Sequence, residues 1–172
     1  MSETWFLISV DAGMSSMPWR IRADSARQIR ETFAEVAVVA GPAERATDLA
    51  AGIDDVDIDS PVLPSALAAL RATRDAQRDR PGFGALLDRD VIHLRARDDE
   101  SDDDTLPEIY LMELGPDGHR RRQVEIFRDG TSVRIRPEDI LFDPPADLYD
   151  PDLAAQEITA AEFEEGWRAA GR

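Results

Sequence analysis

Cysteine and lysine are both absent from the 172 residues of this sequence. Without cysteine the chain forms no disulfide, offers no thiol nucleophile and cannot ligate zinc through thiolates. All twenty basic residues are arginine, so Schiff-base chemistry and a Walker-type phosphate loop lack the lysine that they need. A G-x-S-x-G motif is also missing, which argues against a serine hydrolase built on a nucleophile elbow.

Long apolar runs are lacking as well. The run from Trp5 to Val10 has only six residues, and no positively charged segment precedes it. The sequence therefore predicts no signal peptide and no membrane-spanning segment, and we expect a cytoplasmic protein. The hydrophobic content of 42% is ordinary for a folded protein, and the length suits one domain or two small ones.

Acids outnumber arginines in both halves of the chain. Residues 1–90 contain 15 acids and 10 arginines, whereas residues 91–172 contain 21 acids and 10 arginines, so most of the net charge of −16 lies in the second half. A field of this sign repels nucleic acid and anionic membranes and attracts a basic protein partner. The alternative interpretation is that the charge only keeps the protein soluble.

The clearest structural pattern runs from Ile109 to Ile135, where three apolar or alternating segments are separated by two turn signals. Asp129-Gly130 favours a two-residue hairpin turn, because both residues tolerate positive φ at low cost. Gly115 to Gly118, with the sequence GPDG, marks the other reversal. The pattern predicts a three-stranded antiparallel meander.

The other elements are predicted from apolar spacing and capping residues. Residues 43–60 fit a short helix followed by a strand or an acidic loop, and residues 98–105 fit a mobile acidic loop. The proline-rich residues 137–151 fit an extended surface segment, anchored by Ile140, Leu141, Phe142 and Leu148. Strands are expected at 4–10, 19–23, 36–40 and 91–97, and helices from Ser25 to about Glu35 and from Pro64 toward Arg80.

The C-terminal helix has the most complete start signal. Thr159 is a capping residue, Glu162 completes a capping box, and Ile158 and Phe163 occupy the positions of a hydrophobic staple. Phe163 and Trp167 share one face of this helix, so we expect them to dock on the meander.

Together these elements predict an α+β fold, mainly antiparallel sheet with helices packed on one face. We expect two parts: an N-terminal α/β module of residues 1–88, and residues 89–172 with the meander and the C-terminal helix. Whether the first part folds alone, or one sheet runs through both, stays open. The oligomeric state is not predicted.

Residues 90–168 carry a combination of motifs that resembles a bacterial family of domains of unknown function. Its most specific parts are the hairpin sequence VEIFRDG at 124–130 and the pattern I-T-x-x-E-F-x-x-x-W from Ile158 to Trp167, together with a first strand that contains His93. The resemblance implies a fold unit made of the meander and the last helix. It implies no particular activity.

Few residues suit catalysis or metal binding. The two histidines are His93 and His119, and if the chain is an enzyme the candidate acid and base groups are His93, Glu113 and Glu125, in a site between the two halves. The spaced acids of residues 55–59 resemble the start of a calcium loop, but Ser60 stands at the glycine position and the final glutamate is missing. We expect no metal and no cofactor.

The sequence thus favours a non-catalytic acidic interaction protein, such as an immunity or antitoxin-like inhibitor of a basic bacterial toxin. The alternatives are a small enzyme or ligand-binding module and an accessory domain without a partner of its own. If the meander register is symmetric about the turn at 115–118, some acids and arginines face one another as cross-strand ion pairs, among Glu113, Glu125 and arginines 120–122, 128 and 134. Such pairs form either a salt-bridged solvent face or a recognition surface. The residues predicted to bind the partner are Asp98, Asp99, Glu100, Asp102, Asp103, Asp104, Arg121 and Arg128.

Overall fold

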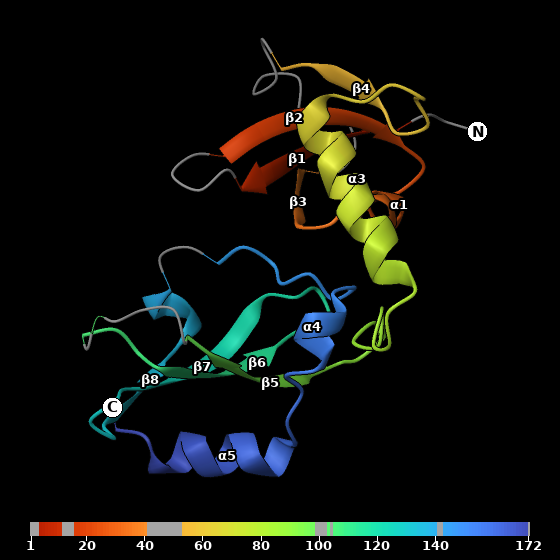
Figure 1. Cartoon of the computed structure of the whole chain (residues 1–172). Helices are drawn as coiled ribbons and strands as arrows, with labels where there is room; N and C mark the ends of the chain where they lie inside the picture. The colour runs from red at the N-terminus through yellow and green to blue at the C-terminus, as the bar shows by residue number, and fades with distance from the viewer. Residues whose placement is uncertain are drawn as a thin grey trace. The chain divides into compact units, whose positions relative to one another are not determined.

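Two four-stranded sheets form the framework of the protein (Figure 1). The computed structural model describes residues 4–11, 16–40, 53–98, 103, 105–140 and 143–171. The chain divides into two compact units, Met1–Phe83 and Gly84–Arg172, a boundary five residues before the one expected from the sequence. Each sheet belongs to one unit, and helices accompany both, so the predicted α+β fold is confirmed.

The sheet of the first unit has the strand order β3-β1-β2-β4. β1 (Thr4–Asp11) pairs antiparallel with both β2 (Ser16–Ala23) and β3 (Val36–Ala40), and β4 (Asp55–Asp57) lies parallel to β2. Residues 55–57 are therefore a strand, one of the two predicted alternatives. The short helix expected from residue 43 falls on residues 41–52, outside the described part of the chain.

Two helices cover one face of this sheet (Figure 1). α1 (Ala26–Thr32) begins after the predicted cap, Ser25. α3 (Ser65–Arg78) begins one residue later than predicted, because Pro64 is its N-cap and not its first helical residue. Their apolar side chains pack against alternate residues of β1 and β2, because successive strand residues point to opposite faces. The core consists of Phe6, Ile8, Val10, Ile21, Ala23, Ile29, Phe33, Val56, Ile58 and Leu67.

The second unit contains the predicted meander. β5 (Ile92–Arg97), β6 (Ile109–Leu114), β7 (Arg120–Ile126) and β8 (Ser132–Ile135) pair antiparallel in this order. Gly118 has φ +85° and Gly130 has φ +83°, the left-handed geometry that their turns require. The meander prediction is confirmed. The predicted two-residue turn at Asp129-Gly130 is wrong, because Asp129 does not have positive φ and residues 127–131 lie between the paired residues Ile126 and Ser132.

The two faces of this second sheet are covered by different segments. α5 (Ala160–Ala169) lies along one face, where it forms an apolar cluster with β6 and β7. The other face carries Ile92, Leu94 and Leu114, which pack against Leu86, Leu148 and the four-residue helix α4 (Pro151–Ala154) (Figure 1). Helices in this unit therefore contact both faces, whereas the sequence predicted one face.

The segment before α4 is only partly extended. It starts with a single 3-10 turn, η1 (Pro137–Asp139), and Leu148 anchors it in the core as predicted. Of the other three predicted anchors, Ile140 is half-buried, and Leu141 and Phe142 are outside the described residues. The sheet edges beside β5 and β8 are met by the chain itself, at Glu157 and Gly171 respectively.

Candidate functional site

The contact between α5 and the sheet joins several of the polar residues that the sequence singled out. Thr159 and Glu162 form the predicted capping box, with the Glu162 amide donating to Thr159 Oγ1 over 3.2 Å. Phe163 is fully buried and packs with Leu111 and Val124, while Trp167 packs against the same cluster. The predicted docking of these two aromatic residues on the meander is confirmed.

A line of polar side chains lies under α5, beside this apolar cluster. His93 Nε2 is 3.2 Å from Glu113 Oε2, and Arg122 Nε donates to Glu113 Oε1 over 3.0 Å. The Arg122 guanidinium also contacts Glu113 Oε2 and donates to Glu164 Oε1 of α5 over 2.5 Å. The His93 and Glu113 side chains are each 13% exposed. These four residues link β5, β6, β7 and α5.

Register explains how three of these residues meet. His93 is the cross-strand neighbour of Glu113, and Glu113 is the neighbour of Arg122, so their side chains point to one face. The cross-strand ion pair between Glu113 and an arginine of the 120–122 run was therefore correctly anticipated. The register shifts after Glu113, and Arg121 stands exposed at the irregularity.

Glu113 and Arg122 stabilise each other in their charged forms. Hydrogen bonds and the nearby charge of Arg122, with a further hydrogen bond from His93, hold the pKa of Glu113 below its ordinary value of 4.5. The hydrogen bonds to Glu113 and Glu164 raise the pKa of Arg122. A carboxylate and a guanidinium that stabilise each other in this way form a structural pair, since neither is poised to exchange a proton near neutral pH.

Aromatic rings complete the layer. The Arg122 guanidinium lies 4.9 Å from the Phe163 ring centroid and 5.1 Å from that of Trp167, and Arg134 lies 5.4 Å from Trp167. Arg134 also donates to the backbone carbonyls of Trp167 and Arg168 at the end of α5. A cation at this position stabilises the negative end of the helix dipole. Two arginines of the unit thus hold α5 on the sheet.

An open groove adjoins this layer at the start of α5. Its volume is about 590 Å³, within the range of ligand-binding pockets. His93 contributes to its lining, so the imidazole borders both the groove and the partly buried ion pair of Glu113 and Arg122. The lining residues are Arg89, Val91, His93, Glu157, Ile158, Thr159, Ala160 and Glu162.

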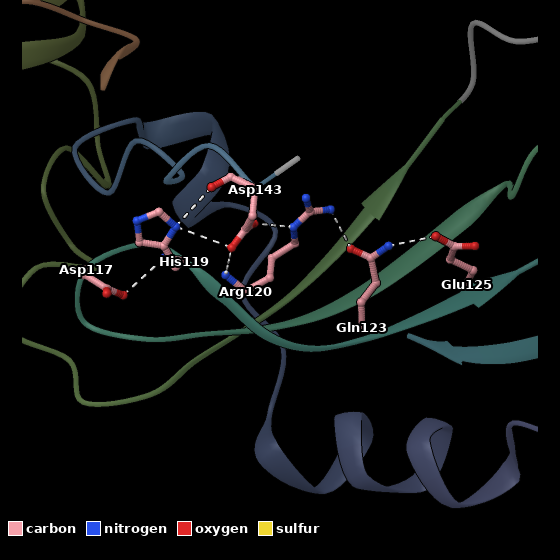
Figure 2. A network of polar contacts seen from close by, with 6 residues as sticks. All are labelled: Asp117, His119, Arg120, Gln123, Glu125 and Asp143. Carbon is pink, nitrogen blue, oxygen red and sulfur yellow. Dashed lines mark hydrogen bonds and ion pairs between the residues drawn. The ribbon is translucent and has the colours of Figure 1, made fainter. Parts of the chain in front are cut away.

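Glu125 belongs to a different network on the opposite face (Figure 2). It accepts a hydrogen bond from Gln123 Nε2 over 2.9 Å, and Gln123 Oε1 accepts one from Arg120 over 3.1 Å. Arg120 pairs with Asp143, whose backbone carbonyl is 3.0 Å from His119 Nδ1. Of the three candidate acid and base groups, the structure brings together His93 and Glu113 only. Glu125 cannot act on the same atom as these two.

In the acidic loop, the structure describes only Asp98, Asp103 and Thr105. Asp99, Glu100, Asp102 and Asp104 are outside the described residues. Asp103 accepts hydrogen bonds from the amide and hydroxyl of Thr105, which together with the charge of Arg128 lower the pKa of the Asp103 carboxyl. Arg128 and Arg121 are both exposed. Asp98, Asp103, Arg121 and Arg128 therefore stand at the surface or close to it.

Sequence reasoning missed Glu164, Arg89 and Glu157. Glu164 lies one residue from Phe163 in a run of acids, where nothing in the local pattern distinguishes it from its neighbours. Its spacing of three from Trp167 was the available signal, because residues at that spacing lie near each other on a helix. Arg89 and Glu157 are 68 positions apart, and their pairing depends on tertiary structure.

Within the residues that the structure describes, no cluster of three or more histidines and acids is arranged to hold a metal ion. No helix in the same residues has the length and apolar character to cross a membrane. Comparison with protein-family models, curated proteins and solved structures finds no match to this chain.

Proposed function

We propose that this chain is a non-catalytic acidic interaction protein whose partner is a basic protein. An immunity or antitoxin-like inhibitor that covers a basic bacterial toxin is the most concrete form of this proposal. Its support is the charge on the surface of the second unit. Residues 84–172 contain 23 acids and 11 arginines, against 13 acids and 9 arginines in residues 1–83.

The exposed residues of the second unit also carry more acids than arginines. Among the described residues of the second unit, eleven acids are exposed but only seven arginines. Arg134 is turned inward onto backbone carbonyls, and Arg122 holds α5 on the sheet. The exposed acids, which face solvent and any partner, are Asp88, Asp90, Asp103, Asp117, Asp129, Glu138, Asp139, Asp152, Glu157, Glu162 and Glu165.

This distribution favours binding by charge over catalysis. Exposed carboxylates accelerate association with a cationic surface and select against anionic ones. The acid closest to an imidazole, Glu113, already makes a bidentate contact with Arg122. Such a carboxylate orients side chains, and its lowered pKa makes it a poor general base.

A capture experiment tests the proposal. The full chain is immobilised, exposed to a lysate of the source cell at low salt, and eluted with increasing salt. The test variant carries Glu138→Gln, Asp152→Asn and Glu165→Gln, three exposed acids, and the matched control carries Arg121→Gln and Arg168→Gln. Captured proteins are identified and assayed for activity with and without the chain.

We expect a basic protein that elutes with salt, binds the acid-depleted variant more weakly, binds the arginine-depleted control at least as well, and loses activity in the complex. Capture of nucleic acid, or of no basic protein at all, would contradict the proposal. Capture without loss of activity would leave the interaction standing and would remove the inhibitor form of it.

One observation favours a second candidate, a small enzyme or ligand-binding module. His93 lines an open groove while a carboxylate holds its Nε2, an arrangement that also orients catalytic imidazoles. Thr159, the hydroxyl in that groove, donates to Glu162 over 2.7 Å and caps α5. Hydrolysis of nitrophenyl esters and phosphates by the wild-type chain, abolished by His93→Gln, would favour this candidate.

A further inference from the structure

On the basis of the proposed function, we propose that the groove at the start of α5 receives an arginine side chain of the basic partner. The groove combines an apolar lining with carboxylates, which is the chemistry that a guanidinium on an aliphatic stem requires. This places the recognition of the partner beside His93, whereas the sequence favoured acids between residues 98 and 104 together with Arg121 and Arg128.

The apolar part of the groove suits the stem of the incoming side chain. Val91 is 42% exposed, and Ile158 and Ala160 line the same space, so the groove presents apolar surface to the incoming side chain. Arginine covers apolar surface with its methylenes while its charged end remains at a polar edge. Burial of Val91 under such a stem removes apolar area from water.

Glu157 provides the acceptor. Its carboxylate is 39% exposed, and its partner Arg89, 53% exposed, approaches only to 3.7 Å, too far for a hydrogen bond. An exposed pair at this distance is weak. Glu157 thus already attracts a guanidinium but holds it loosely, so an arginine that makes two parallel hydrogen bonds can displace Arg89.

The surrounding charges favour a cation over an anion. Asp88 and Asp90 flank Arg89 in the sequence and are exposed, and Glu162 lines the groove. Arg89 and Arg95 oppose these acids, and Arg95 is close enough to help lower the pKa of Glu162. At the start of α5 the Glu162 carboxylate already accepts from the Thr159 amide over 2.8 Å, and its negative charge disfavours an anion there.

A titration followed by two-dimensional amide NMR tests this inference in the full chain at low ionic strength. The probe is acetyl-Gly-Arg-Gly amide, and the matched probe contains citrulline, which has the same shape without the charge. Dissociation constants are compared for wild type, Glu157→Gln and Arg89→Gln. Glu138→Gln, an exposed acid outside the groove lining, is the control.

We expect the arginine probe, and not the citrulline probe, to shift the amides of Val91, His93 and Ile158. Glu157→Gln should weaken binding about threefold or more, as the loss of one exposed ion pair allows. Arg89→Gln should strengthen binding by removing the internal competitor, and Glu138→Gln should leave it unchanged.

Three results would overturn the inference: shifts spread over the whole acidic surface, no shifts at all, or weaker binding by Arg89→Gln. The proposed function is tested separately by capture. If the partner is captured equally by wild type, Glu157→Gln and Arg89→Gln, the groove assignment fails while the proposed function stands. If wild type captures no basic protein, the proposed function itself fails.

Discussion

Gly166 gives a test of how closely α5 lies on the sheet. A Cβ added at this position would be 2.3 Å from Leu111 Cδ1, more than an ångström inside the 3.4 Å at which ordinary contact begins. Leu111 is buried at 6% exposure beside Val124 and Phe163, so its methyl group has little room to rotate away. Gly166→Ala therefore forces α5 away from the sheet or distorts the cluster.

Two opposing effects set the size of the change. Overpacking of a buried site costs about 1 to 3 kcal/mol. Alanine in place of glycine within a helix stabilises the helix by about 0.8 to 1 kcal/mol. Because the first effect is larger at this separation, Gly166→Ala should lower the free energy of unfolding of the second unit by up to about 2 kcal/mol.

Urea denaturation measures this difference. Trp167 fluorescence reports the second unit when Trp5 and Trp19, which belong to the first unit, are replaced by phenylalanine. In a Leu111→Ala background the clash is absent, and Gly166→Ala should become neutral or stabilising by up to about 1 kcal/mol. If Gly166→Ala stabilises the chain that retains Leu111, the close packing of α5 described above is wrong.

Two further predictions concern the same unit. Glu113→Gln should destabilise it by about 1 to 3 kcal/mol at neutral pH. Arg122 lowers the folded-state pKa of Glu113 below 4.5. The difference in free energy of unfolding between wild type and Glu113→Gln should therefore be complete above pH 4.5 and should vanish as the pH falls through the folded-state pKa. A constant difference in urea titrations across pH would refute the pairing. In thermal melts, Gly118→Ala should lower the melting temperature more than Gly130→Ala. Both glycines have positive φ, but of the two only a Cβ at Gly118 meets a neighbour, the Ala146 carbonyl oxygen at 2.6 Å. Equal decreases would contradict this.

Local sequence patterns were sufficient to predict the meander and the last helix. Residues 109–135 consist of three strand-like segments separated by two turn sequences, so the pairing order of the strands follows from neighbours in the chain. Thr159, Glu162 and Phe163 fix the start of α5 in the same way, through contacts within one helical turn. Such contacts depend little on the rest of the fold, and this explains why both elements were predictable.

The remaining features depend on contacts between distant residues. β4 has three residues and exists through its parallel pairing with β2, which no local pattern indicates. α4 has only four residues and lies in a proline-rich segment that reads as extended. Neither could be assigned from spacing alone, because elements this short are stabilised by the surfaces on which they lie.

The candidate site shows the same division. The sequence indicated that Glu113 faces an arginine of residues 120–122, but symmetry about the turn at 115–118 would pair it with Arg120. The register shift between Glu113 and Leu114 places Arg122 there instead. Glu125 lies on the opposite face of the sheet from His93 and Glu113, because successive strand residues point to opposite faces. The sequence contains this alternation, but the exact register is needed to assign each residue to a face. The groove formed by Arg89, Val91 and Glu157 joins residues distant in the chain and required the structure.

The most direct test of the proposed acidic interaction is the association rate constant between the chain and its captured basic partner as a function of salt concentration. We predict a rate that falls steeply as salt rises from 0.01 M toward 1 M, a range over which the Debye length shrinks from about 30 to about 3 Å. The variant lacking Glu138, Asp152 and Glu165 carboxylates should associate more slowly and show a shallower dependence. A rate that does not change with salt, or is equal for both proteins, would contradict the account.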